Sequence, residues 1–128
     1  MCLLGGPKGY TVGAPGAFGP FVAEEGRTRD YVYVEDVALA NVVALENEIP
    51  SGAYNIGTGL ETSVNRLYEL LLENSAKNLP PQHGPAKPGE QLRSSVDPSL
   101  AERVLGWRPE VRLPVGLRET YRFFAAAK

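Results

Sequence analysis

Two arginines stand directly in front of the most strand-like stretch of the sequence. Arg27 and Arg29 precede the β-branched and aromatic run Tyr31–Val34, which leads without a break into an acidic helix start. An arginine at the mouth of a strand can bind a phosphate, because its guanidinium presents a planar fork of N–H donors. The residues equally allow a surface ion pair of Arg29 with Asp30 or Asp36. Chemistry alone leaves both interpretations open.

A second candidate lies in a proline-rich loop, where Lys87 and Glu90 flank the pair Pro88-Gly89. A cation followed three residues later by a carboxylate can hold a diphosphate and a sugar hydroxyl, with the proline and glycine forming the turn between them. The alternative is a solvated Pro-Gly turn that binds nothing. Arg93 adds charge to the same loop, and a surface role for it is equally open.

Two glycine patterns suggest a dinucleotide site, but neither fits well. After Gly57-Thr58-Gly59, Thr62 stands where the pattern needs glycine or alanine, and no acidic residue closes a second strand about twenty residues later. We interpret this segment as a tight strand-to-helix turn. The glycines at 13, 16 and 19 have no strand–helix unit around them. We therefore expect no cofactor-binding residues in this chain.

The composition excludes several other kinds of site. Cys2 is the only cysteine, which excludes an internal disulfide and a cysteine-based zinc site, and His83 is the only histidine, without metal-ligand spacing. We expect His83 to be a plain loop residue, and expect no catalytic and no metal-binding residue. The net charge of −2 argues against nucleic-acid binding. Without an apolar run of about 18 residues or a basic leader, no membrane partner and a cytoplasmic location are expected.

The predicted elements give an α/β fold. Residues 1–26 are predicted to be an irregular arm rich in glycine and proline, and residues 27–128 a regular domain. Two short strands are predicted at Tyr31–Val34 and Ala53–Ile56. About four helices are predicted: from Glu35 to about Glu48, after a Thr62 or Ser63 cap, from Asp97-Pro98 to Gly106, and from Leu113-Pro114 onward. Trp107 is expected to anchor the core.

Five sequence blocks, in matching order and spacing, resemble the C-terminal part of the NAD-dependent epimerase/dehydratase family, the extended short-chain dehydrogenases. Within the family the likeness is to sugar-nucleotide enzymes of the UDP-glucose 4-epimerase type. The region from Arg27 to Phe124 covers about three-quarters of the chain, and its blocks are RDYVYVEDVALANVVALE (29–46), GAYNIGTGLETSV (52–64), PAKPGE (85–90), VDPSLAERVLGW (96–107) and GLRETYRFF (116–124).

The resemblance implies a fold and three substrate-binding residues. Residues 27–128 would be the substrate-binding portion of an extended short-chain dehydrogenase, with the Rossmann half missing. Arg29 matches the arginine that contacts the diphosphate of the nucleotide sugar. Lys87 matches a second phosphate-binding position, which is usually arginine, and a lysine offers a point charge without the fork. Glu90 matches the acidic residue that holds the ribose hydroxyls.

The resemblance also implies a reaction for which this sequence lacks the catalytic pair. The family uses NAD and a Tyr-x-x-x-Lys pair, in which the tyrosine shares a proton with a sugar hydroxyl. Four residues after each of the six tyrosines stands alanine, glutamate, valine, threonine or leucine, never lysine. We therefore expect that this chain alone does not bind NAD. We also expect that it does not remove a hydride from C4 of a UDP-hexose and return it to the other face.

The expected partners are a nucleotide sugar, with a UDP-hexose favoured, and, as one option, a separate NAD-binding domain. Two other functions stay open: a non-catalytic module that binds a UDP-sugar or docks on a partner, and a truncated gene product without a role of its own. The blocks do not fix the sugar, because epimerases, dehydratases and decarboxylases of the family share them.

Overall fold

The computed structural model describes residues 26–75, 80–81, 83 and 88–126. The described chain has two strands and four helices: β1 (Thr28–Asp30), α1 (Val34–Glu46), β2 (Glu61–Ser63), α2 (Val64–Ser75), α3 (Ser99–Leu105) and α4 (Leu113–Ala126). β1 and β2 pair antiparallel, with Arg29 opposite Thr62. The predicted α/β class, with two short strands and four helices, is confirmed.

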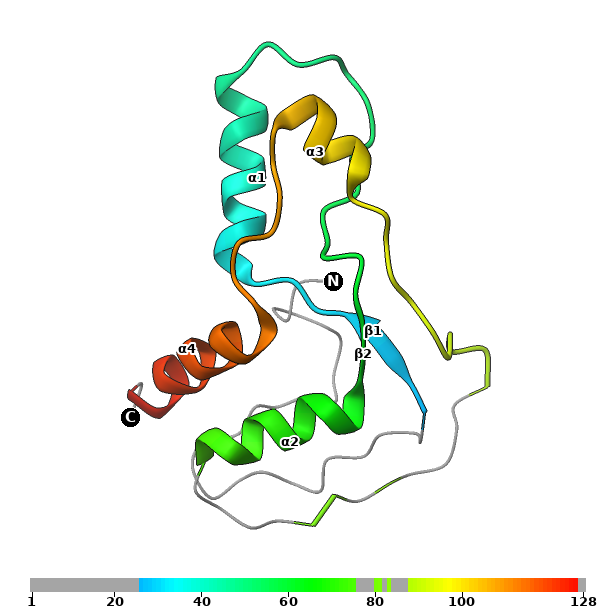
Figure 1. Cartoon of the computed structure of the whole chain (residues 1–128), viewed down its shortest axis with the longest axis vertical. Helices are drawn as coiled ribbons and strands as arrows, with labels where there is room; N and C mark the ends of the chain where they lie inside the picture. The colour runs from blue at the N-terminus through cyan, green and yellow to red at the C-terminus, as the bar shows by residue number, and fades with distance from the viewer. Residues whose placement is uncertain (1–25, 76–79, 82, 84–87, 127–128) are drawn as a thin grey trace.

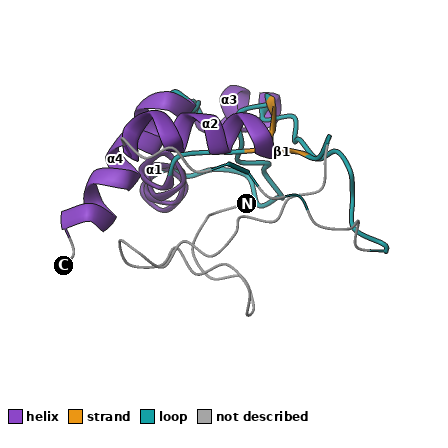
Figure 2. Ribbon diagram, turned by 90° about the horizontal axis from the view of Figure 1, so that it is seen from below, coloured by secondary structure: helices purple, strands orange, loops and turns teal. Residues whose placement is uncertain are grey.

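The helices form two groups, one on each side of the β1–β2 ribbon (Figure 1). α1 packs with α3, and α2 packs with α4. Each group has a small core of its own, made by Ala40, Ala101 and Trp107 in the first and by Leu67, Leu70 and Leu117 in the second. In the view turned by 90°, the helices lie together in one shallow layer (Figure 2). The ribbon and its loops therefore connect two modest cores.

The ends of the helices follow the signals in the sequence. Ser63 accepts a hydrogen bond on its Oγ from the Arg66 backbone N–H at 3.1 Å, which caps α2 as predicted. Asp97 accepts one from the Ser99 N–H at 2.9 Å at the start of α3. Gly106 ends α3 in the left-handed region, with φ +64°, where a side chain would be strained.

Trp107 anchors the core, as predicted. Its side chain is 2% exposed. Its indole Nε1–H donates to the backbone carbonyl of Asp36 at 2.8 Å, so the polar end of the ring is satisfied inside the first core. The Asp36 carboxylate is also buried and accepts the backbone N–H groups of Glu110 and Val111. These bonds fix the segment between α3 and α4 against the start of α1.

The predicted positions of both strands were wrong. Tyr31–Tyr33 and Ala53–Ile56 lie outside the strands, and Val34 already begins α1. The alternating pattern is nevertheless real, because Tyr31 packs on the second core and Val32 on the first. Alternation makes a segment extended, but a strand also needs a neighbour for its backbone hydrogen bonds. In the described residues that pairing occurs at Thr28–Asp30 and Glu61–Ser63 instead.

The predicted arm at residues 1–26 lies outside the described residues, apart from Gly26, and so does the glycine pattern at 13–19. Within the ranges that the structure describes, no helix has the length and apolar character needed to span a bilayer.

Candidate functional site

Asp30, at the end of β1, collects backbone donors from two distant segments. Its side chain is buried, and its carboxylate accepts the N–H and the hydroxyl of Thr58, the N–H of Gly59 at 2.9 Å and the N–H of Val96 at 3.4 Å. Burial raises the pKa of Asp30, but the hydrogen bonds from Thr58, Gly59 and Val96 outweigh burial and leave the pKa below its ordinary value. Asp30 therefore holds the turn at 57–59 and the segment before α3 against the ribbon.

This arrangement explains the glycine pattern at 57–59 without a cofactor. A Cβ on Gly57 would lie 2.3 Å from Cγ2 of Val96 and 2.8 Å from Oδ2 of Asp30, so the position has no room for a side chain. The segment is a tight turn, but the predicted strand-to-helix setting was wrong: the residues before it are not a strand, and β2 lies between it and α2. The backbone N–H groups of Thr58 and Gly59 both donate to the Asp30 carboxylate.

Arg29 and Glu90, predicted separately as site residues, lie together. The guanidinium Nη2 of Arg29 is 3.6 Å from Oε1 of Glu90, and Arg27 Nη1 is 2.6 Å from the same oxygen. Arg29 Nη1 also donates to the Thr28 carbonyl at 2.7 Å and to the Leu92 carbonyl at 3.5 Å. We call Arg27, Arg29 and Glu90 the candidate site. It joins β1 to a loop about sixty residues further along the chain.

The alternative ion pair of Arg29 with Asp30 or Asp36 was wrong, because those carboxylates accept backbone N–H groups while Arg29 pairs with Glu90. The predicted turn before Glu90 is present, with Gly89 at φ +80°. Lys87 lies outside the described residues. The pairing of Arg27 was missed, although its position two residues before Arg29 puts both side chains on one face of an extended chain.

The three side chains of the candidate site carry an excess of positive charge. Two guanidinium groups face one carboxylate, which leaves one net positive charge among the three side chains. The side chain of Arg27 is 8% exposed, that of Arg29 16% and that of Glu90 38%. The carboxylate is thus the most accessible of the three, and it can accept hydrogen bonds from hydroxyl groups while it keeps the arginines in place.

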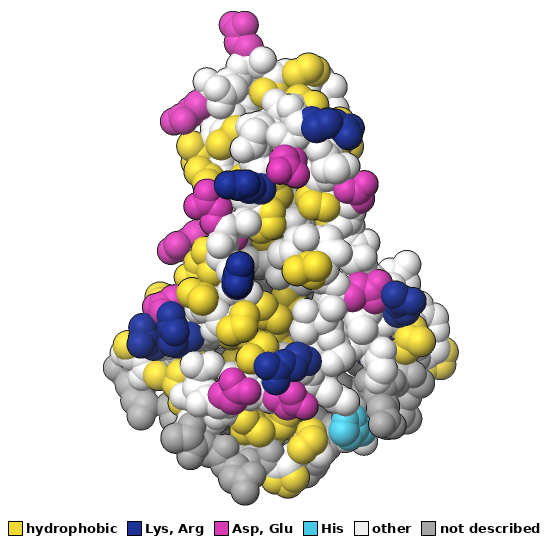
Figure 3. Space-filling view, in the orientation of Figure 1, with side chains coloured by type: hydrophobic (Ala, Val, Ile, Leu, Met, Phe, Trp, Pro, Cys, Tyr) yellow, Lys and Arg dark blue, Asp and Glu magenta, His cyan; other side chains and the backbone are white. Residues whose placement is uncertain are grey.

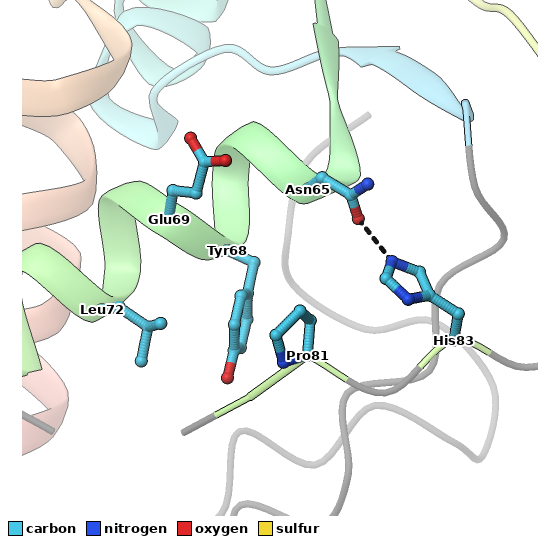
Figure 4. Close-up of a pocket in the computed structure, with 6 residues that line it drawn as sticks. All are labelled: Asn65, Tyr68, Glu69, Leu72, Pro81 and His83. Atoms are coloured by element: carbon cyan, nitrogen blue, oxygen red, sulfur yellow. Dashed lines mark hydrogen bonds between the residues drawn. The ribbon is translucent and has the colours of Figure 1, made fainter. Parts of the chain in front are cut away.

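A pocket of about 270 Å³ lies elsewhere, along one face of α2. Tyr68 and Pro81 stand next to each other in it, and His83 Nε2 lies 3.0 Å from Oδ1 of Asn65 (Figure 4). Neither Arg29 nor Glu90 lines this pocket. His83 is an exposed loop residue, and no group of three or more His, Cys, Asp or Glu side chains within the described ranges could hold a metal ion.

Comparison with known proteins shows which family this chain is similar to. Residues 20–57, a range that includes β1 and α1, match the family described as "NAD dependent epimerase/dehydratase family". A UDP-glucose 4-epimerase of Mycolicibacterium smegmatis is 38% identical over 97 residues, which cover 76% of this chain and 31% of that protein. The chain matches the C-terminal part of the NAD-dependent epimerase/dehydratase family.

Solved structures of the family have the same fold over most of this chain. A UDP-glucose 4-epimerase of Thermotoga maritima, determined with UDP-glucose, is 37% identical with a TM-score of 0.77, over 84% of this chain and 34% of its own. A UDP-glucuronic acid 4-epimerase of Bacillus cereus, in complex with UDP-glucuronic acid and NAD, is 28% identical with a TM-score of 0.77, over 85% of this chain and 36% of its own. The chain thus spans about a third of the relatives that it matches.

Proposed function

We propose that this chain is the C-terminal, nucleotide-sugar-binding portion of a UDP-glucose 4-epimerase-like NAD-dependent epimerase, and that it is inactive alone. The proposal is supported by the ion pair between Arg29 of β1 and Glu90, which are about sixty residues apart in the sequence. Residues 27–128 form the binding domain in this proposal, residues 1–26 are an arm outside it, and Arg29, Lys87 and Glu90 contact the substrate.

The chemistry of binding follows from the charges at the candidate site. The Arg29 guanidinium donates to the diphosphate, and the family resemblance gives Lys87 a second contact with the same group. Glu90 accepts hydrogen bonds from the ribose hydroxyls on its exposed side. Arg27, which is almost fully buried and 2.6 Å from Glu90, holds that carboxylate in place.

The proposed lack of activity rests on the sequence. NAD supplies hydride transfer in the parent family, and no tyrosine of this chain is followed at the fourth position by a lysine that could assist it. Pure protein is incubated with UDP-galactose and NAD, and UDP-glucose is measured. We expect none above the blank. Turnover well above the blank would refute this part of the proposal.

Binding is tested by calorimetry with UDP on the wild type, on Arg29→Ala and on Arg122→Ala, which removes an exposed arginine of α4. We expect saturable binding that weakens with salt, because part of the attraction is between charges. Arg29→Ala should weaken it about tenfold, the loss of a charged hydrogen bond, and Arg122→Ala should leave it unchanged. Absence of binding by a folded wild type would remove the proposal.

A second candidate function, docking on a partner such as a separate NAD-binding domain, is supported by the surface of α1. Leu39, Val42 and Leu45 of this helix are 44%, 43% and 86% exposed, and Phe123 of α4 is 69% exposed. Hydrophobic side chains are visible along much of the face shown in Figure 3. A helix that is apolar on several sides is usually buried, so these surfaces favour a covering partner.

A truncated product would expose the same surfaces, so the two cases need a discriminating observation. An adjacent reading frame that encodes a glycine-rich NAD loop and a Tyr-x-x-x-Lys pair, and whose product binds this chain in a sedimentation experiment, would support docking. Strong binding of a hydrophobic dye by the isolated chain, together with no association, would favour a truncated product.

A further inference from the structure

The loop that carries Glu90 is attached to the β1–β2 ribbon at Leu92, Arg93 and Val96. The Leu92 carbonyl accepts the backbone N–H of Thr28 at 2.9 Å. The Arg93 guanidinium binds the Glu61 carboxylate through two bonds, Nε to Oε2 at 2.9 Å and Nη2 to Oε1 at 3.0 Å. The Val96 N–H reaches Asp30 at 3.4 Å. The segment 92–96 is thus fixed along the ribbon.

The pairing of the strands explains why the ribbon needs this loop. Asp30 lies directly opposite Glu61, so two acidic side chains share one face, where like charges destabilise a strand pair. The charge of Asp30 is offset by backbone N–H groups, and that of Glu61 by Arg93 and by the Thr28 hydroxyl, which donates at 2.6 Å. Hydrogen bonds from Arg93 and Thr28 lower the pKa of Glu61 and keep it ionised.

We infer that Glu61 and Arg93 are positioning residues for nucleotide binding: their ion pair holds the loop so that Glu90 faces Arg27 and Arg29. Glu90 lies only two residues before the Leu92 attachment and three before Arg93, so the Arg93 bonds add to the Leu92 bond in restraining the loop, and their loss loosens the position of the carboxylate. In this inference Glu61 and Arg93 act through the position of Glu90 and make no contact of their own with the nucleotide. The inference rests on the proposed function and names the residues on which that site depends.

The exposure of Arg93 limits the expected effect. Its side chain is 72% exposed and that of Glu61 is 27% exposed, and single exposed ion pairs contribute little. This pair differs because it is bidentate and because Thr28 donates to the same carboxylate, so that three groups from three segments form one network. We expect its removal to weaken UDP binding about fivefold.

The test uses two independent measurements on the whole chain. Hydrogen exchange of the Thr28 and Val96 amides without nucleotide reports whether the loop is attached, and calorimetry with UDP reports affinity. The variants are Arg93→Ala, Glu61→Gln, the double variant, and the charge exchange Glu61→Arg with Arg93→Glu. The matched control is Arg66→Ala, which removes an exposed Arg–Glu pair of 2.9 Å within α2.

The inference predicts faster exchange and weaker UDP binding in both single variants, no further loss in the double variant, and partial recovery in the charge exchange. Circular dichroism and Trp107 fluorescence should match the wild type throughout. Unchanged amide exchange in Arg93→Ala would overturn the inference whatever the affinity does, and so would an equal loss of affinity in Arg66→Ala. A folded wild type that binds no UDP would overturn the proposed function instead, and the exchange data would still decide the attachment of the loop.

Discussion

Replacing Asp30 should destabilise the fold more than any exposed acidic substitution. The Asp30 carboxylate, on a side chain only 8% exposed, accepts hydrogen bonds from Thr58, Gly59 and Val96. Asp30→Ala leaves these donors without their acceptor and removes the connection between β1, the turn at 57–59 and the segment before α3. The change acts on the architecture that positions the candidate site.

The magnitude follows from the hydrogen bonds. A bond to a charged group contributes about 1.5–3 kcal/mol, and the contributions of several donors to one carboxylate do not add fully. Water can also reach part of the vacated site. We therefore expect a loss of about 3 kcal/mol in the free energy of unfolding, a large part of the roughly 5–15 kcal/mol that holds a typical domain together. Thr58→Val, which removes one hydroxyl donor, should cost about 1 kcal/mol.

The assay is urea unfolding followed by the fluorescence of Trp107, the only tryptophan, which is buried. With a slope of about 1.5 kcal/mol per molar urea, the midpoint of Asp30→Ala should fall by about 2 M. The control Asp97→Ala removes an exposed carboxylate that accepts one helix-start N–H, and should cost about 1 kcal/mol or less. A midpoint for Asp30→Ala equal to that of the control would contradict the role of Asp30 as the shared acceptor of these hydrogen bonds.

The pH dependence gives the same prediction a second test. Because the pKa of Asp30 in the folded chain lies below its ordinary value of 3.8, its contribution to stability is present above that value and is lost as the pH falls through the lower one. The stability difference between the wild type and Asp30→Ala should stay constant from pH 7 to about 5 and shrink below about pH 4. A difference that grows on acidification would contradict the assignment.

Two further substitutions test the packing around the site. Gly57→Ala should destabilise by about 2 kcal/mol, since its Cβ would lie 2.3 Å from Val96 Cγ2, whereas Gly52→Ala, whose Cβ would meet nothing closer than 3.7 Å, should be nearly neutral in thermal unfolding. Trp107→Phe should cost about 3 kcal/mol in calorimetric unfolding, because it leaves a cavity and removes the donor to the Asp36 carbonyl; a loss under 1 kcal/mol would contradict this role.

The helices could be predicted because their signals are local. Ser63 and Gly106 mark helix ends through bonds and backbone angles that involve only neighbouring residues. The strands could not be placed, because a strand is defined by its partner. Tyr31 and Val32 alternate between two cores and read as a strand, yet the three residues before them are the ones that pair with β2.

The site shows the same division. Arg29 and Glu90 were predicted from their residue types and from the family resemblance, and the structure brings them together. The partners of Asp30 and the pairing of Arg93 with Glu61 could not be predicted, because they join segments about thirty residues apart or more. Asp30 and Glu61 lie opposite each other in the β1–β2 ribbon, and each carboxylate therefore needs its own hydrogen-bond donors. The sequence pattern did not identify this strand register.

A map of where UDP binds tests the proposed nucleotide site. Backbone amide resonances of the isotope-labelled chain are compared with and without UDP. We expect the largest shifts at residues 27–30 and 88–93, and we expect about tenfold more UDP to be needed to reach them in Arg29→Ala. Shifts confined to the pocket along α2, at Asn65, Tyr68 and Glu69, would show that UDP binds there and not at Arg29 and Glu90.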